Sequence, residues 1–191
     1  MASRDQATSR ARTALVLIDV FNRFDYEDGA ALAQSTLRIL PALRRLRAHF
    51  DERRLPVIHA NDNFLDWSVG FAELVAACRA TPGASSKIAE ALTPLPHHYY
   101  LLKPRHSAFL GTPLPIMLTD LGINAVVLAG IATDSCILAT AQDAKMRDIR
   151  FRVPSDATAA ATPSRKAAAL RVLRTSFKSD TRDVRALLGE T

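Results

Sequence analysis

Continuous apolar runs alternate with amphipathic stretches along this chain of 191 residues. Short apolar runs with no polar alternation are typical of strands buried on both faces, as in parallel sheets. The predicted strands are residues 13–20, 56–60, 98–103, 124–130 and 149–154. Apolar spacings of three and four residues, together with turn residues at the ends, indicate helices between them. The predicted helices are residues 30–54, 70–79, 85–92, 113–122, 134–147 and 163–175.

Strands that alternate with helices favour a parallel sheet covered on both faces. We therefore predict an α/β fold, a three-layer α/β/α sandwich with a mostly parallel, Rossmann-like sheet of about six strands. The sixth strand is expected in the C-terminal tail, with a short helix after it. Because Pro41 interrupts the stripe of 30–54, a kink or two helices are expected there. Residues 1–12 are predicted to be a flexible tail and residues 13–191 a single domain.

Composition narrows the class of protein. Apolar residues make up 48% of the chain, which indicates a globular fold. No apolar run approaches the roughly 18 residues of a membrane span, and the polar start lacks a signal-peptide core. Two distant cysteines, Cys78 and Cys136, form no disulfide framework. These observations predict a cytoplasmic protein with no membrane partner.

The formal net charge of +6 raises the question of nucleic-acid binding. The basic residues are scattered, however, and the densest set lies between residues 38 and 54 on one predicted helix. A solvated helix face explains that set, and no recognised nucleic-acid motif is present. We predict no nucleic-acid partner.

Three chemically active side chains are expected at one edge of the sheet. Asp19 ends the first predicted strand, Lys103 ends the third, and Cys136 follows the fourth. Ligands of open parallel sheets bind at the carboxyl ends of the strands. Helix N–H groups and Lys103 would lower the pKa of the Cys136 thiol, and Asp19 would accept its proton. Each residue alone has an ordinary structural explanation, and Cys78 is expected to be a core residue.

Four segments carry a resemblance to a known family. They read "ALVLIDVFNRF", "LKPRHSAFLGTPL", "LAGIATDSCILATAQDAKMR" and "VPSDATAA". In these segments the chain resembles the isochorismatase-like cysteine hydrolases, which include nicotinamidases and N-carbamoylsarcosine amidases. The resemblance implies that Asp19, Lys103 and Cys136 are catalytic. It also implies a cis peptide between Ile131 and Ala132 and an oxyanion hole made by the N–H groups of Ala132 and Cys136.

The implied reaction cleaves a C–N bond of a small amide, carbamoyl or ureido compound through a covalent thioester. Cys136 is the nucleophile, Asp19 protonates the departing amine and then activates water, and Lys103 balances the charge. The resemblance also implies a homo-oligomer, either a dimer or a tetramer.

The chain departs from nicotinamidases at the expected metal site. Those enzymes hold a metal through an aspartate and several histidines in a D-x-H spacing. Here Asp62 is followed by Asn63 and Phe64, and the next histidine is His97. The carboxylate of Asp62 and the amides of Asn61 and Asn63 suit a transition metal poorly. We predict no metal and no other cofactor, and nicotinamide is disfavoured as substrate.

Loop residues near the predicted site are candidates for the walls of a small-molecule pocket. The candidates are Phe24, Asn61, Asn63, Trp67, His106 and Phe109. Trp67 lies in a long polar loop, and His106 is close to the end of the third strand.

Two other functions stay open at this point. The first is a vinyl-ether hydrolase of the isochorismatase type, which acts without covalent attack; Cys136 argues against it. The second is a non-catalytic basic binding protein on the same fold. Loss of all turnover on replacement of Cys136 would separate the cysteine hydrolase from both.

Overall fold

The computed structural model describes residues 12–64 and 66–189. The first eleven residues of the predicted tail lie outside this range, as do residues 190–191. Six strands form one parallel sheet: β1 (Thr13–Ile18), β2 (Val57–Asp62), β3 (Tyr99–Lys103), β4 (Ala125–Ile131), β5 (Arg150–Arg152) and β6 (Thr158–Ala159). Their order is β3-β2-β1-β4-β5, with β6 paired to β4.

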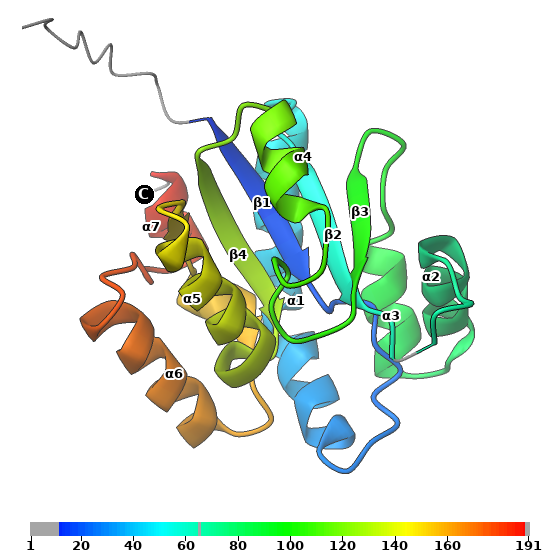
Figure 1. The fold of residues 1–191 in the computed structure, drawn as a ribbon. Coiled ribbons are helices and arrows are strands. Elements are labelled where there is room, and N and C mark those ends of the chain that lie inside the picture. Colours follow the sequence, from blue (N-terminus) through cyan, green and yellow to red (C-terminus); the bar gives the residue numbers. More distant parts are fainter. Residues whose placement is uncertain (1–11, 65, 190–191) are drawn as a thin grey trace, which may run out of the picture.

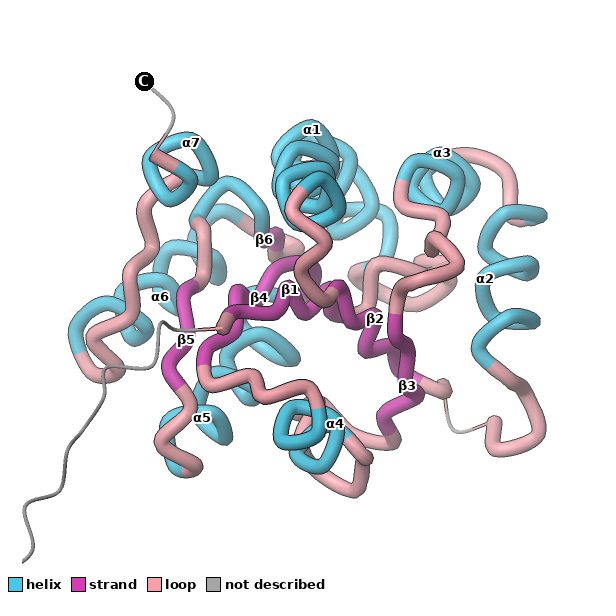
Figure 2. Tube along the Cα trace, turned by 90° about the horizontal axis from the view of Figure 1, so that it is seen from above, coloured by secondary structure: helices cyan, strands magenta, loops and turns pink. Residues whose placement is uncertain are grey.

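Helices cover both faces of this sheet. They are α1 (Gly29–Glu52), α2 (Phe71–Ala80), α3 (Ala84–Ala91), α4 (Leu114–Asp120), α5 (Leu138–Met146), α6 (Pro163–Thr175) and α7 (Val184–Leu188). Figure 1 shows them around the sheet, and the view from above in Figure 2 places α1, α3 and α7 on one face and α4 and α5 on the other. The predicted three-layer α/β/α fold is confirmed. None of the helices in the described ranges is long and apolar enough to cross a membrane.

Two apolar cores explain why the strands read as uninterrupted apolar runs. Successive side chains of β1 point to opposite faces. Leu15 and Leu17 join the core beneath α1, whereas Val16 and Ile18 join the core beneath α4 and α5. Both faces of the central strand β1 are therefore buried in apolar cores. Its first charged side chain, Asp19, comes directly after the strand ends.

The long first helix passes through Pro41, so of the two outcomes expected there, a kink or two helices, the division into two helices is wrong. Proline inside a helix costs about 3 kcal/mol. Burial of each large apolar side chain contributes roughly 1.5–3 kcal/mol, and Ile39, Leu43 and Leu46 are all buried on the inner face of α1. Pro41 itself is exposed, so its ring stays out of the core. Packing along the whole helix thus outweighs the lost hydrogen bond.

The sixth strand was predicted in the tail, but it lies earlier, at Thr158–Ala159. The short β5 pairs with only the first half of β4, which leaves the second half open. Thr158 and Ala159 fill this space beside Gly130 and Ile131. The tail contributes an isolated bridge between Arg152 and Asp180, followed by the expected short helix, α7.

Candidate active site

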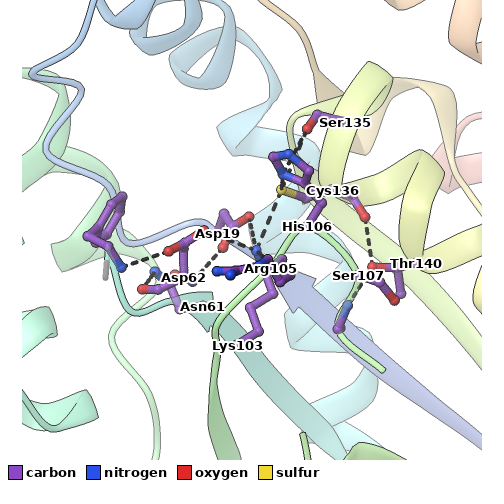
Figure 3. Close-up of polar contacts among 12 residues, drawn as sticks. Asp19, Asn61, Asp62, Lys103, Arg105, His106, Ser107, Ser135, Cys136 and Thr140 are labelled. Carbon is purple, nitrogen blue, oxygen red and sulfur yellow. Dashed lines mark hydrogen bonds and ion pairs between the residues drawn. The ribbon is translucent and has the colours of Figure 1, made fainter. Parts of the chain in front are cut away.

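Three side chains from distant segments meet at the carboxyl edge of the sheet (Figure 3). Asp19 directly follows β1, Lys103 is the last residue of β3, and Cys136 lies in the turn after β4. Lys103 Nζ is 2.8 Å from Asp19 Oδ2 and 3.5 Å from Cys136 Sγ. The parallel order of the strands brings these ends together, as the sequence predicts.

Gly130 allows β1, which leads to Asp19, to lie close to β4, which leads to the turn that carries Cys136. Gly130 pairs with Ile18 in the β1–β4 ladder and has φ +116°. A Cβ at Gly130 would lie 2.1 Å from the Ile18 carbonyl oxygen, so no other residue fits. Asp19, the next residue after Ile18, has φ +52°, a conformation that Asp tolerates better than most residues.

The carboxylate of Asp19 is held on both of its oxygens. Its Oδ1 accepts a hydrogen bond of 2.7 Å from the backbone N–H of Asp62, and its Oδ2 faces Lys103. Lys103 also donates to the Arg105 carbonyl at 3.2 Å and lies 3.6 Å from Asp62 Oδ2. The Lys103 side chain is fully buried, so its ammonium depends on these oxygens for all the polar contacts that water would supply.

The charges of the cluster differ from the sequence-based expectation. Burial and, after it, the negative charge of Asp19 raise the pKa of Cys136 to about 12, and the opposing effect of Lys103 is smaller. The predicted lowering of this thiol pKa is therefore wrong, and the resting thiol is protonated. Burial also raises the pKa of Asp19, despite the nearby ammonium of Lys103. Burial acts to lower the pKa of Lys103, but the charge of Asp19 raises it above its usual value.

The segment that holds the thiol begins with a wide turn. The predicted helix 134–147 starts as a π-helical turn, Thr133–Ile137, before α5. Thr140 Oγ1 donates to the Cys136 carbonyl at 2.7 Å and accepts from the Ala108 N–H at 3.0 Å. Thr140 thus ties the turn that carries Cys136 to the loop after β3. Sequence analysis missed this threonine, because nothing in the helical pattern separates it from a neutral position.

A cavity of about 400 Å³ opens beside the cluster. Asp19, His106, Ala132 and Ser135 are among its walls, and the Ile131–Ala132 peptide bond is cis. The other wall residues are Asn22, Tyr26, Glu27, Asp28, Leu32, Asp62, Phe64, Ala161 and Arg165. Its volume suits a small molecule.

Residues 13–182 match the Isochorismatase domain family. The chain belongs to the isochorismatase family. It is 34% identical to the isochorismatase family protein YaaI of Bacillus subtilis over 79% of this chain and 82% of that protein. It is 42% identical to the ureidoacrylate amidohydrolase RutB of Methylorubrum extorquens over 47% of this chain, which spans only 37% of RutB. The crystal structure of N-carbamoylsarcosine amidase from Thermoplasma acidophilum has a TM-score of 0.70 at 26% identity, covering 91% of this chain and 96% of that one.

Of the six predicted pocket residues of this isochorismatase-family chain, His106 lines the cavity, and Asn61 and Phe109 are among those buried elsewhere. Asn61 is 1% exposed, and its amide donates to the Phe21 carbonyl and accepts from the Phe21 N–H. It fixes the backbone just after Asp19 and forms no wall. Phe109 is 3% exposed and packs in the core beneath α4 and α5.

The other three predicted wall residues also lie outside this cavity. Phe24 packs at the border of the core beneath α1, and Trp67 is 77% exposed. Asn63 lines a separate hollow with Arg23. The walls come instead from residues that were not among the candidates, such as Tyr26, Asp28 and Arg165. Their positions depend on how the loops fold, which has no periodic signal.

An ion-paired bridge lies at the cavity wall. Arg165, on α6, contacts Asp28 Oδ2 at 2.7 Å through Nη1 and Asp134 Oδ2 at 2.5 Å through Nε. These partners are 137 and 31 residues away along the chain. The bridge therefore joins the segment before α1 to the turn that carries Cys136.

The residues around Asp62 do not form a metal site of the kind expected in nicotinamidases. Asp62 Oδ1 accepts from the Phe64 N–H at 2.7 Å, and its Oδ2 faces the Lys103 ammonium, so a cation there would meet a positive charge. Within residues 12–64 and 66–189, one group has three close metal-type ligands: Asp51, His97 and His98. It lies beside the start of β3, at the opposite edge of the sheet. No step of the reaction proposed below is assigned to a metal.

Proposed function

We propose that this chain is a cysteine hydrolase that cleaves a C–N bond of a small amide, carbamoyl or ureido compound. The observation that carries the proposal is the contact of the Cys136 sulfur with Lys103, which is itself paired with Asp19, beside a cavity of small-molecule size. Two relatives support the bond type, since RutB is a ureidoacrylate amidohydrolase and the Thermoplasma protein an N-carbamoylsarcosine amidase.

In the first step the thiol must lose its proton as it attacks. A thiol with a pKa of about 12 supplies little thiolate at neutral pH, so a neighbouring base is needed. Asp19 is that base, and its raised pKa strengthens its hold on the proton. Lys103 stabilises the negative charge while it moves from carboxylate to sulfur.

The carbonyl oxygen becomes negative when the C–S bond forms. We assign its stabilisation to the backbone N–H groups of Ala132 and Cys136, which belong to the turn after β4. Asp19 then returns its proton to the nitrogen of the leaving group, and the C–N bond breaks. Water cleaves the resulting thioester, so that the reaction uses side chains, backbone amides and water alone.

Release of ammonia from a panel of small amides and ureido acids tests the proposal. Wild-type protein is expected to turn over at least one member, and Cys136→Ala to turn over none. Cys78→Ala removes the other thiol, which lies in the core away from the site, and serves as the control. Retained activity in Cys136→Ala would overturn covalent catalysis and favour the vinyl-ether type of mechanism. Inactivity of the wild type on every compound, with no acylation of Cys136 by a reactive ester, would overturn the hydrolase itself.

A further inference from the structure

A histidine touches the proposed nucleophile from the side of the cavity. His106 Nδ1 is 3.5 Å from Cys136 Sγ and 3.2 Å from Ser135 Oγ. His106 is exposed in the loop after β3 and lines the cavity together with Ser135. Figure 3 shows it beside Ser135 and Cys136. Asp19 also hydrogen-bonds this sulfur, so two bases of different kinds reach it.

The two bases reach the sulfur from different environments. Asp19 borders the same cavity but is only 5% exposed, and its oxygens are already engaged by Lys103 and the Asp62 N–H. His106 meets solvent in the cavity through which water must arrive. A base that activates water has to lie within hydrogen-bond reach of that water near the carbonyl carbon. An imidazole in contact with Sγ lies close to the carbon of any acyl group that this sulfur carries.

We propose that His106 is a further catalytic residue, the general base that activates water in the second half of the reaction. The inference rests on the proposed function, because it requires a thioester on Cys136. It replaces the role that the family resemblance gives to Asp19 in this half, and leaves Asp19 with the proton transfers of the first half.

The protons of the step balance as follows. A water O–H gives its proton to the Nδ1 lone pair of His106 while its oxygen bonds to the thioester carbon. The tetrahedral intermediate then collapses, the C–S bond breaks, and the carboxylic acid leaves. The imidazolium returns its proton to the Cys136 sulfur, which restores the thiol and the neutral ring. The acid product loses its own proton to solvent.

Acylation itself makes the histidine available. In the resting enzyme the protonated thiol can donate to Nδ1 of the neutral ring, within the 3.5 Å contact. Once sulfur carries an acyl group, it has no proton to donate, and the same lone pair is open to water. Ser135 Oγ lies 3.2 Å from the same Nδ1, so its O–H must point away from the ring when water takes that lone pair.

The test uses 4-nitrophenyl acetate as an acylating probe, so no natural substrate is needed. The first turnover releases nitrophenolate and leaves acetyl-Cys136, which is isolated by rapid gel filtration. Loss of the acetyl group is then followed by intact mass spectrometry. The variants are His106→Gln and His106→Ala, with His97→Gln as the control, since His97 is an exposed histidine at the opposite edge of the sheet.

We expect wild type, His97→Gln and both His106 variants to give the initial burst. Deacetylation of the His106 variants should be at least about 100-fold slower, the lower end of the range for a lost general base. Free imidazole should restore part of the rate in His106→Ala, which a purely structural role would not allow. Deacetylation within threefold of wild type, or loss of the burst itself, would overturn the assignment to His106 while leaving the hydrolase standing. Absence of acetyl-Cys136 in wild type would overturn the proposed function, and this inference with it.

Discussion

Lys103 and Asp19 form a 2.8 Å ion pair that is almost sealed from solvent, with the ammonium fully buried and the carboxylate side chain 7% exposed. Removing two charges from water costs several kcal/mol per ion, which their attraction and hydrogen bonds must offset. A well-packed apolar pair would fill the same space at no such cost. The pair is therefore better explained by the chemistry at Cys136 than by stability.

Replacement of Lys103 by Met should abolish turnover and destabilise the fold. The variant leaves the Asp19 carboxylate buried without its counter-charge, which typically costs 3–5 kcal/mol. Urea denaturation measures the loss. The double variant Asp19→Asn/Lys103→Met removes both charges and should recover most of the stability but no activity. Equal destabilisation of the single and double variants would contradict an ion pair with this role.

Alkylation of Cys136 by iodoacetamide should rise steadily with pH. Because burial raises the thiol pKa to about 12, the thiolate fraction grows about tenfold for each pH unit between 7 and 10 and reaches no plateau there. Peptide mapping separates Cys136 from the buried Cys78. In Asp19→Asn the loss of the negative charge lowers the thiol pKa, so alkylation should be faster at each pH. A plateau below pH 9 in wild type would show a thiol that ionises far more easily.

Gly130→Ala should prevent β1 and β4 from packing as closely as they do beside the site. The new Cβ would lie 2.1 Å from the Ile18 carbonyl oxygen, so backbone must move, and we expect a loss of more than about 3 kcal/mol or failure to fold. Gly83→Ala is the matched control, because Gly83 has a similar φ of +103° with nothing within 4 Å of the added Cβ. Its loss should stay near 1–3 kcal/mol, the cost of the backbone conformation alone. Similar melting temperatures for the two variants would argue against the close approach.

Thr162→Ala should weaken the start of α6. The threonine hydroxyl accepts a hydrogen bond of 3.2 Å from the Arg165 N–H, and a lost N-cap of this kind costs about 1 kcal/mol. Thermal denaturation should show the decrease, and Ser164→Ala, in the first turn of the same helix, should change it little. A larger effect at Ser164 than at Thr162 would contradict the cap.

The strands and most helices were predictable because burial on both faces leaves a direct mark on the sequence. The meeting of Asp19, Lys103 and Cys136 followed from that topology alone. The charge state of the thiol did not follow, since it depends on how much water the folded protein excludes, and local patterns carry no measure of that. The error at Phe109 has the same origin: an aromatic residue in a loop reads alike whether it faces a cavity or the core.

Much of the cavity wall comes from segments that carry none of the proposed reactive groups. Strand ends and a glycine contact between backbones fix Asp19 and Cys136, whereas residues 22–28 and 161–165 supply much of the cavity wall. Redesign of substrate preference can therefore start with residues 22–27, which lie outside the Arg165 bridge. Arg165 has to be kept, because it also pairs with Asp134 in the turn that carries Cys136.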